Sequence, residues 1–298
     1  MGVYFPAYYK DFKCIADKCR HSCCIGWEIG VDADTMDKYL GMGGGLGEDI
    51  RSHLNSEESV ISMQEDGRCP FLDKCGLCRI ISAIGEENTS RICQEHPRFY
   101  HRVLDRIEGG IGASCEEACR IILSSDPFDE FIEVTSSAEP SFETYFDSIG
   151  HRNYIFSFLR DAKIPLADII KTIRERYDIP SLDEISWDEA FDSLEYLDES
   201  KAGSFSVGGR DPREESQKLI TRFLAYLVYR HVSVSENYDD LRARIGFCLL
   251  LAAVFENSLS KLDYNFDIAV EIARTISEEI EYSEDNTSSL IMEMWSII

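Results

Sequence analysis

Residues 68–98 read RCPFLDKCGLCRIISAIGEENTSRICQEHPR. Cys69, Cys75 and Cys78 follow one another at short spacings in this stretch, and Cys93 comes near its end. Thiols that share one loop can close a small chelate ring around a soft metal ion or an iron–sulfur cluster. We therefore expect this stretch to fold as loops around a metal.

Ten of the eleven cysteines fall in the first 119 residues, and Cys14, Cys19, Cys23 and Cys24 form a second group upstream. One zinc ion takes four ligands, and one [4Fe–4S] cluster typically takes four cysteines. Ten cysteines are therefore enough for two metal sites. Alternatively, they form one site, and the remaining cysteines pack or have another role. Their spacing does not choose between zinc and iron.

The candidate metal ligands share this clustering and are Cys14, Cys19, Cys23, Cys24, Cys69, Cys78, Cys93 and Cys115. Cys24 is the less straightforward member, because chain neighbours often cannot both face one metal. Cys115 begins a predicted helix, a position that favours the thiolate form. Cys75 is either a ligand or an incidental loop residue. Cys119 and Cys248 lie on apolar helix faces, which favours simple packing.

The net charge is 30 − 55 = −25. Such a chain repels phosphate backbones, so we expect no nucleic-acid partner. An acidic chain attracts basic surfaces, including lysine-rich protein segments. The alternative is that the charge only keeps the protein soluble. An apolar fraction of 44% supports a real core without disulfide bridges.

The first residues, MGVYFPAYYKDFKC, lack the pattern of a secretion signal. The longest apolar run, residues 245–255, is shorter than the roughly 20 residues of a membrane span. We therefore expect a cytoplasmic protein without a membrane partner. Thiols stay reduced in that compartment, which favours metal binding over disulfide bonds.

The chain is predicted to be mainly α, with a cysteine-rich metal-binding region over residues 1–125 and a helical, bundle-like region over residues 126–298. A short helix is expected at residues 34–40, and the glycine-rich residues 41–47 are expected to be a flexible linker. The sequence shows no clear run of alternating strands. Amphipathic patterns predict the remaining helices at residues 114–123, 154–162, 166–177, 187–198, 214–232, 239–258, 267–281 and 288–297.

Several segments together resemble the bacterial flagellin lysine-N-methylases. These are YYKDFKCIADKCRHSCCIGWEIGVD at residues 8–32, the quoted residues 68–98, ASCEEACRIIL at residues 113–123 and, more loosely, RFLAYLVYRHV at residues 222–232. The resemblance implies an enzyme that transfers a methyl group from S-adenosylmethionine to lysine side chains of flagellin. It also implies an iron–sulfur cluster, and the eight candidate ligands named above match the cysteines of the family pattern.

The sequence leaves the catalytic and donor-binding residues unknown. Tyr8, Tyr9, Glu28 and Asp32 lie beside the first cysteine group and are candidates for removing a proton from the amine. Trp27 and Tyr8 are candidates for flanking a cationic sulfonium, with packing as their alternative role. Two other functions stay open: a non-catalytic protein with a structural zinc or iron site, and an electron-transfer or redox-sensing module.

Overall fold

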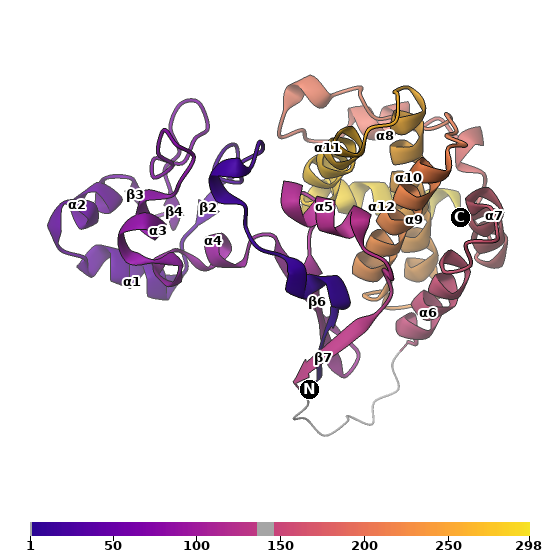
Figure 1. Ribbon diagram of the computed structural model, residues 1–298, viewed down its shortest axis with the longest axis horizontal. Coiled ribbons are helices and arrows are strands. Elements are labelled where there is room, and N and C mark those ends of the chain that lie inside the picture. Colours follow the sequence, from indigo (N-terminus) through magenta and orange to yellow (C-terminus); the bar gives the residue numbers. More distant parts are fainter. Residues whose placement is uncertain (1, 136–145) are drawn as a thin grey trace. The chain divides into compact units, whose positions relative to one another are not determined.

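The computed structural model describes residues 2–135 and 146–298 (Figure 1). The chain forms two compact units. The smaller unit is Lys13–Phe99, and the larger unit combines Met1–Phe12 with Tyr100–Ile298. This division differs from the boundary expected near residue 125, because the first strand and residues 100–125 belong to the larger unit. The mainly α fold class is confirmed.

The smaller unit is built from short elements. Its α-helices are α1 (Ala33–Gly41), α2 (Gly44–Ser52), α3 (Arg79–Ile84) and α4 (Arg91–Glu95). A small antiparallel sheet has the order β2-β4-β3, with β2 (Ile29–Gly30), β4 (Val60–Ile61) and β3 (Leu54–Asn55). No element of this unit is long enough to be stable alone, so its packed core must hold it together.

The helix expected at residues 34–40 is α1, and the Asp32 carboxylate caps its start by accepting the Thr35 N–H at 3.1 Å. The flexible linker expected after this helix is wrong, because α2 begins at Gly44. Gly47 explains why glycine is needed there. A Cβ at Gly47 would stand 2.2 Å from the Met42 carbonyl oxygen, so only glycine permits this close approach of helix and turn.

The core of the smaller unit mixes aliphatic, aromatic and thiol groups. Its buried residues are Ile29, Val31, Tyr39, Ile50, Ile61, Cys69, Phe71 and Ile80. Cys24 and Cys78 are partly buried and pack against this group. Cysteine side chains are therefore part of the core, and are not confined to exposed loops.

The larger unit contains a four-stranded sheet of order β5-β6-β1-β7. The strands are β5 (Arg98–Val103), β6 (Arg106–Ile111), β1 (Gly2–Pro6) and β7 (Phe131–Thr135). Strand β1 runs parallel to β6 and antiparallel to β7. The sequence did not indicate these strands, because strands this short show no sustained alternation of apolar and polar residues.

Eight α-helices lie in the described part of the larger unit, the first of them between β6 and β7. They are α5 (Glu116–Ser124), α6 (Ser148–Leu159), α7 (Leu166–Arg176), α8 (Asp188–Asp192), α9 (Glu214–Leu227), α10 (Tyr238–Ser260), α11 (Phe266–Ile276) and α12 (Glu284–Ile297). Two of them continue into π-helical turns, Val228–Val232 after α9 and Ser277–Glu281 after α11. Figure 1 shows α9, α10 and α12 together in this unit, and α10 packs against both of the others.

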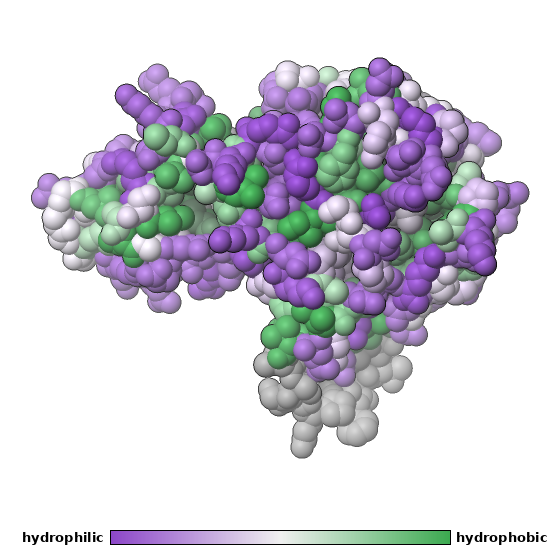
Figure 2. Space-filling model, viewed as in Figure 1, coloured by the Kyte–Doolittle hydropathy of each residue, from purple (hydrophilic) through white to green (hydrophobic). Residues whose placement is uncertain are grey.

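Helix α10 is the centre of the larger unit. It is long and apolar enough to cross a membrane by length and composition, but 78% of its most apolar window is buried inside the protein. That burial is typical of the core helix of a soluble protein. Figure 2 agrees, since hydrophilic residues cover most of the visible face.

Candidate metal centre

Cys24 and Cys69 are brought together by backbone pairing between two distant loops. The Cys69 N–H donates to the Cys24 carbonyl at 2.8 Å, and the Gly26 N–H donates to the Gly67 carbonyl at 2.9 Å. A bridge between Ile25 and Arg68 lies within the same pairing. These contacts fix the register of the two loops and place one thiol from each group side by side.

Cys78 returns to the same place because residues 69–78 fold back on themselves. Leu72 and Cys78 form a bridge, and the Arg79 N–H donates to the Phe71 carbonyl at 2.8 Å. The Asp73 carboxylate holds the tip of this loop by accepting the Cys75 and Leu77 N–H groups. Cys78 then begins helix α3.

Cys93 lies on α4, and a single carboxylate ties the start of this helix to α1. Asp32 Oδ2 accepts the Arg91 N–H at 2.8 Å, while the other Asp32 oxygen caps α1. The Ser90 hydroxyl donates to the Cys93 sulfur at 3.2 Å. Ser90 is fully buried and fixes this thiol's orientation.

Cys24, Cys69, Cys78 and Cys93 form one group, which we call the four-thiol cluster. Each of its six pairs interacts electrostatically. Within residues 2–135 and 146–298, however, no three Cys, His, Asp or Glu side chains form a ready coordination group. The four sulfurs are thus neighbours without being a closed coordination shell.

The surroundings of the cluster oppose four free thiolates. Burial raises the pKa of Cys69 to about 12 and also raises the pKa of Cys78. Cys24 differs, because a hydrogen bond from the adjacent Cys23 lowers its pKa to about 7 despite burial. Without a cation, most of these sulfurs therefore stay protonated, and metal binding would release protons.

Hydrogen-bond donors nonetheless point at the sulfurs. The Phe71 N–H donates a hydrogen bond to the Cys69 sulfur, and the N–H groups of Ile80 and Ile81 donate to the Cys78 sulfur. The Ser90 hydroxyl donates to the Cys93 sulfur. Donors around a thiolate centre orient the ligands and spread their negative charge. These four cysteines and their donors have the chemistry of a site for a metal that prefers sulfur, but their sulfurs are not drawn together as a ligand set in the described residues.

The other predicted ligands are placed differently. Cys14 is exposed, and its sulfur accepts the Ala16 N–H at 3.4 Å. Cys19 donates to the His21 carbonyl, and exposed Cys23 contacts Cys24. Cys115 belongs to the larger unit, where it precedes α5. Cys115 is the N-cap of this helix, in agreement with its predicted position at a helix start.

Cys119 and Cys248 are fully buried in α5 and α10, in agreement with the packing role expected for them. Exposed Cys75 contributes its backbone N–H to Asp73. Sequence reasoning missed Tyr39 and Ser90. Both side chains interact with sulfurs of the four-thiol cluster. A signal for Tyr39 exists in its spacing of four from Thr35, since both lie on the buried face of α1.

Asp32 and Tyr8, two of the candidates for removing a proton from the amine, have structural roles instead. Asp32 is occupied as a helix cap and as the acceptor for Arg91, and hydrogen bonding to Arg91 is the main reason for its lowered pKa. Tyr8 is buried in the larger unit, where burial and the charge of Glu281 raise its pKa. Neither group is suited to accept a proton near neutral pH.

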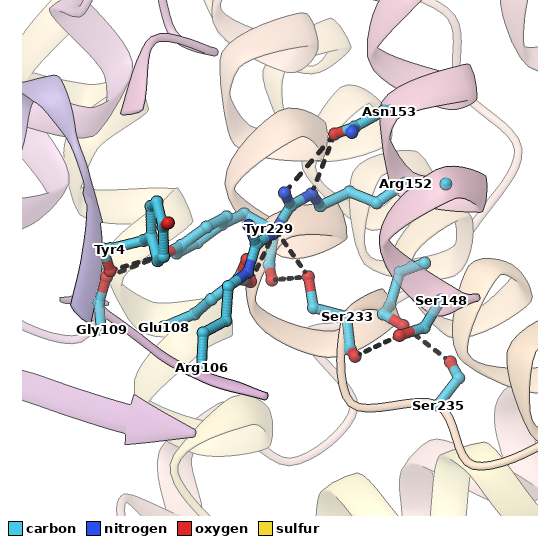
Figure 3. Close-up of polar contacts among 12 residues, drawn as sticks. Tyr4, Arg106, Glu108, Gly109, Ser148, Arg152, Asn153, Tyr229, Ser233 and Ser235 are labelled. Carbon is cyan, nitrogen blue, oxygen red and sulfur yellow. Dashed lines mark hydrogen bonds and ion pairs between the residues drawn. The ribbon is translucent and has the colours of Figure 1, made fainter. Parts of the chain in front are cut away.

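A buried ion-pair network joins the sheet to the helices of the larger unit (Figure 3). Glu108 on β6 meets Arg152 on α6 at 2.6 Å and Arg106 at 2.6 Å. Arg152 also donates to the Ser233 hydroxyl at 2.9 Å. Tyr229 donates to the Gly109 carbonyl at 2.9 Å. The network fixes α6 and the π-helical turn after α9 against the sheet.

A second buried network centres on Glu281. Its carboxylate contacts His231 Nε2 at 2.8 Å, accepts the Tyr226 hydroxyl at 2.8 Å and pairs with Arg230 at 3.3 Å. Burial alone would raise the pKa of Glu281, but Arg230 and His231 bring it to about 2. The Ala113 N–H donates to the Tyr226 oxygen, so the network also fixes the backbone just before Cys115.

The four-thiol cluster and its supporting loops lie in the region where the sequence resembled a known family. A lysine-N-methylase of Salmonella choleraesuis is 28% identical over 135 residues, covering 41% of this chain and 32% of that protein. The chain is similar to lysine-N-methylases. This similarity confirms the resemblance identified from the sequence.

A lysine-N-methylase of Salmonella typhimurium matches to the same extent, and a flagellar biosynthetic protein FliU of Salmonella muenchen is 27% identical over 135 residues. The match covers 76% of the FliU protein but about a third of either lysine-N-methylase. No family model matches the chain. No solved structure matches it either.

Proposed function

We propose that this protein is an S-adenosylmethionine-dependent protein-lysine N-methyltransferase that acts on flagellin or another lysine-bearing protein. The observation that carries the proposal is the similarity to lysine-N-methylases over 135 residues. A net charge of −25 also suits the approach of a lysine-bearing segment.

We further propose that the four-thiol cluster holds a [4Fe–4S] cluster, with zinc as the alternative. Four sulfurs match the usual ligand number of either centre. An iron–sulfur cluster, when bound, supplies electron transfer or a binding position for a ligand. The chain's own part is to orient the sulfurs through Ser90 and the backbone N–H donors, and to keep water from the buried side of the site.

The predicted ligands of the smaller unit that lie outside the four-thiol cluster separate two versions of this proposal. Cys14, Cys19 and Cys23 belong either to a second site in that unit or to none. Quantitative metal analysis distinguishes these versions. One [4Fe–4S] cluster per chain corresponds to about four irons with matching sulfide, and a second centre would exceed that content.

The test combines metal analysis with an activity assay on protein purified without oxygen. We expect about four irons and matching acid-labile sulfide per chain, followed by methyl transfer from labelled S-adenosylmethionine to flagellin lysines. A flagellin whose lysines are chemically blocked is the control. A loaded protein that transfers no label to flagellin would contradict the methyltransferase proposal and leave the metal proposal standing.

A second candidate function is a non-catalytic protein with a structural metal. The observation in its favour is that Cys24, Cys69 and Cys78 belong to the core packing of the smaller unit. Stoichiometric zinc without colour, together with no binding of S-adenosylmethionine, would support this function. Iron with sulfide would count against the zinc form of it.

A further inference from the structure

Tyr39 contributes its side chain to the centre of the smaller unit. It lies on α1, is 0% exposed, and belongs to the same core group as Cys69. Cys24 and Cys78 pack against that group. The aromatic ring fills the core as a phenylalanine would, so packing does not explain the hydroxyl.

The hydroxyl of Tyr39 is buried, and it has no hydrogen-bond partner within residues 2–135 and 146–298. Leaving a buried hydroxyl unsatisfied costs about 1–3 kcal/mol, which a phenylalanine at this position would avoid. Tyrosine hydroxyls in protein interiors usually find a partner. The Tyr39 hydroxyl is therefore a buried donor without an acceptor among the described residues.

Three sulfurs and one carboxylate interact electrostatically with Tyr39: those of Cys93, Cys78 and Cys69 in the four-thiol cluster, and that of Asp32. The Asp32 oxygens already accept the N–H groups of Thr35 and Arg91, which leaves the sulfurs as candidate acceptors. A tyrosine hydroxyl keeps its proton at neutral pH and can act as a donor. A neutral thiol is a weak acceptor, whereas a metal-bound thiolate carries negative charge and accepts a hydrogen bond strongly.

We infer that the Tyr39 hydroxyl donates a hydrogen bond to a sulfur of the metal-loaded four-thiol cluster and stabilises the bound metal. Tyr39 is thus a positioning residue that completes the donor set formed by Ser90 and the N–H groups of Phe71, Ile80 and Ile81. The inference rests on the proposed metal at this cluster. It does not depend on methyl transfer.

The experiment compares Tyr39→Phe with the unaltered protein and with Tyr177→Phe. Tyr177 is a fully buried tyrosine of the larger unit whose hydroxyl contacts His151 at 3.1 Å, so its variant controls for the loss of a buried hydroxyl. Metal release to a chelator is followed by absorbance at neutral pH. We expect release from Tyr39→Phe to be at least about tenfold faster, as losing an outer partner of a metal ligand typically produces. We expect Tyr177→Phe to release metal at the unaltered rate.

Unfolding of the metal-free proteins supplies the second measurement. If the hydroxyl serves only the metal, metal-free Tyr39→Phe is as stable as the unaltered metal-free protein, or more so, because an unsatisfied group has been removed. For an iron–sulfur centre, the reduction potential should also fall, since a hydrogen bond to sulfur stabilises the more negative reduced form.

Equal release rates for Tyr39→Phe and the unaltered protein would overturn the inference. Equal destabilisation of the metal-free and metal-loaded forms would overturn it too, because the hydroxyl would then have an ordinary structural partner. An unaltered protein that binds neither iron nor zinc would instead overturn the proposed metal site. A failure of methyl transfer would leave the result for Tyr39 unaffected.

Discussion

The smaller and the larger unit differ in the size and composition of the cores that stabilise them. In the larger unit, the 23-residue helix α10 alone buries fifteen residues. The smaller unit has no described helix longer than nine residues and a core group of eight, one of which is a cysteine. A segment of that size with so small a core has a low free energy of unfolding unless something else stabilises it, and a bound metal often does so. The comparison teaches that the thiols make up a large part of a small core in one unit, whereas in the other Cys119 and Cys248 are two packing residues among many.

The largest expected effect is on the smaller unit. Cys69→Ser should remove the metal and unfold Lys13–Phe99, because site and core share this buried side chain. The helices of the larger unit should remain. Metal analysis and limited proteolysis measure the two effects, and Cys248→Ala, a buried cysteine of α10, is the control that should retain metal. Metal retained in Cys69→Ser would remove Cys69 from the ligand set.

The next effect concerns the larger unit alone. Arg152→Met breaks the buried pair with Glu108 and should lower the free energy of unfolding by about 3 kcal/mol. Metal content should not change. Lys218→Ala removes an exposed pair with Glu214 and should be indistinguishable from the unaltered protein in denaturant unfolding. Metal loss in Arg152→Met would show that the two units depend on each other.

Acid should weaken the larger unit in two steps. Burial lowers the pKa of His101 to about 4, so the unfolded chain binds a proton that the folded one excludes as pH falls from about 6.5 to 4. Glu281, with its pKa lowered to about 2, stabilises the fold above about pH 4.5 and loses that contribution as pH falls towards 2. The pKa values of His231 and His151 are also lowered by burial, so unfolding temperatures measured against pH should show a smaller upper step in His101→Gln and an unchanged lower step. An unchanged slope above pH 4 would contradict the role of His101.

The smallest expected effect is at the edge of the four-thiol cluster. Ser90→Ala removes the hydroxyl that donates to the Cys93 sulfur, a contribution of about 1 kcal/mol, and should speed metal release roughly fivefold. Ser125→Ala, which removes a hydroxyl bonded to the Ile121 carbonyl in the larger unit, is a matched control. Identical release from the Ser90 variant would mean that Cys93 is not a ligand.

The sequence predicted the parts of this molecule that depend on local pattern. The 3.6-residue periodicity located α7, α9, α10 and α11 within a few residues. Helix α8 is shorter than predicted, ending at Asp192, and α6 begins at Ser148, before its apolar stripe is evident. The strands escaped detection because β2, β3 and β4 have two residues each.

The candidate site shows the same limit. Thiol spacing singled out Cys69 and Cys78, but it could not say that Cys24 rather than Cys23 turns towards them. That choice depends on the pairing of Cys69 with Cys24 across more than forty residues. Placing Cys115 in the larger unit depends on β6, which precedes it and pairs with β1. Long-range pairing of this kind leaves no local trace in the sequence.

The position of β1 has a consequence for how the chain folds during synthesis. Strand β1 is translated before its partners β6 and β7, which lie beyond residue 105. The whole of Lys13–Phe99 is translated in between. At a typical rate of about 5–20 residues per second, β1 waits several seconds for its neighbours, and the cysteine-rich segment is complete near the end of that wait, before β7 is made. Metal delivery between the completion of this segment and the synthesis of β7 would therefore precede closure of the sheet.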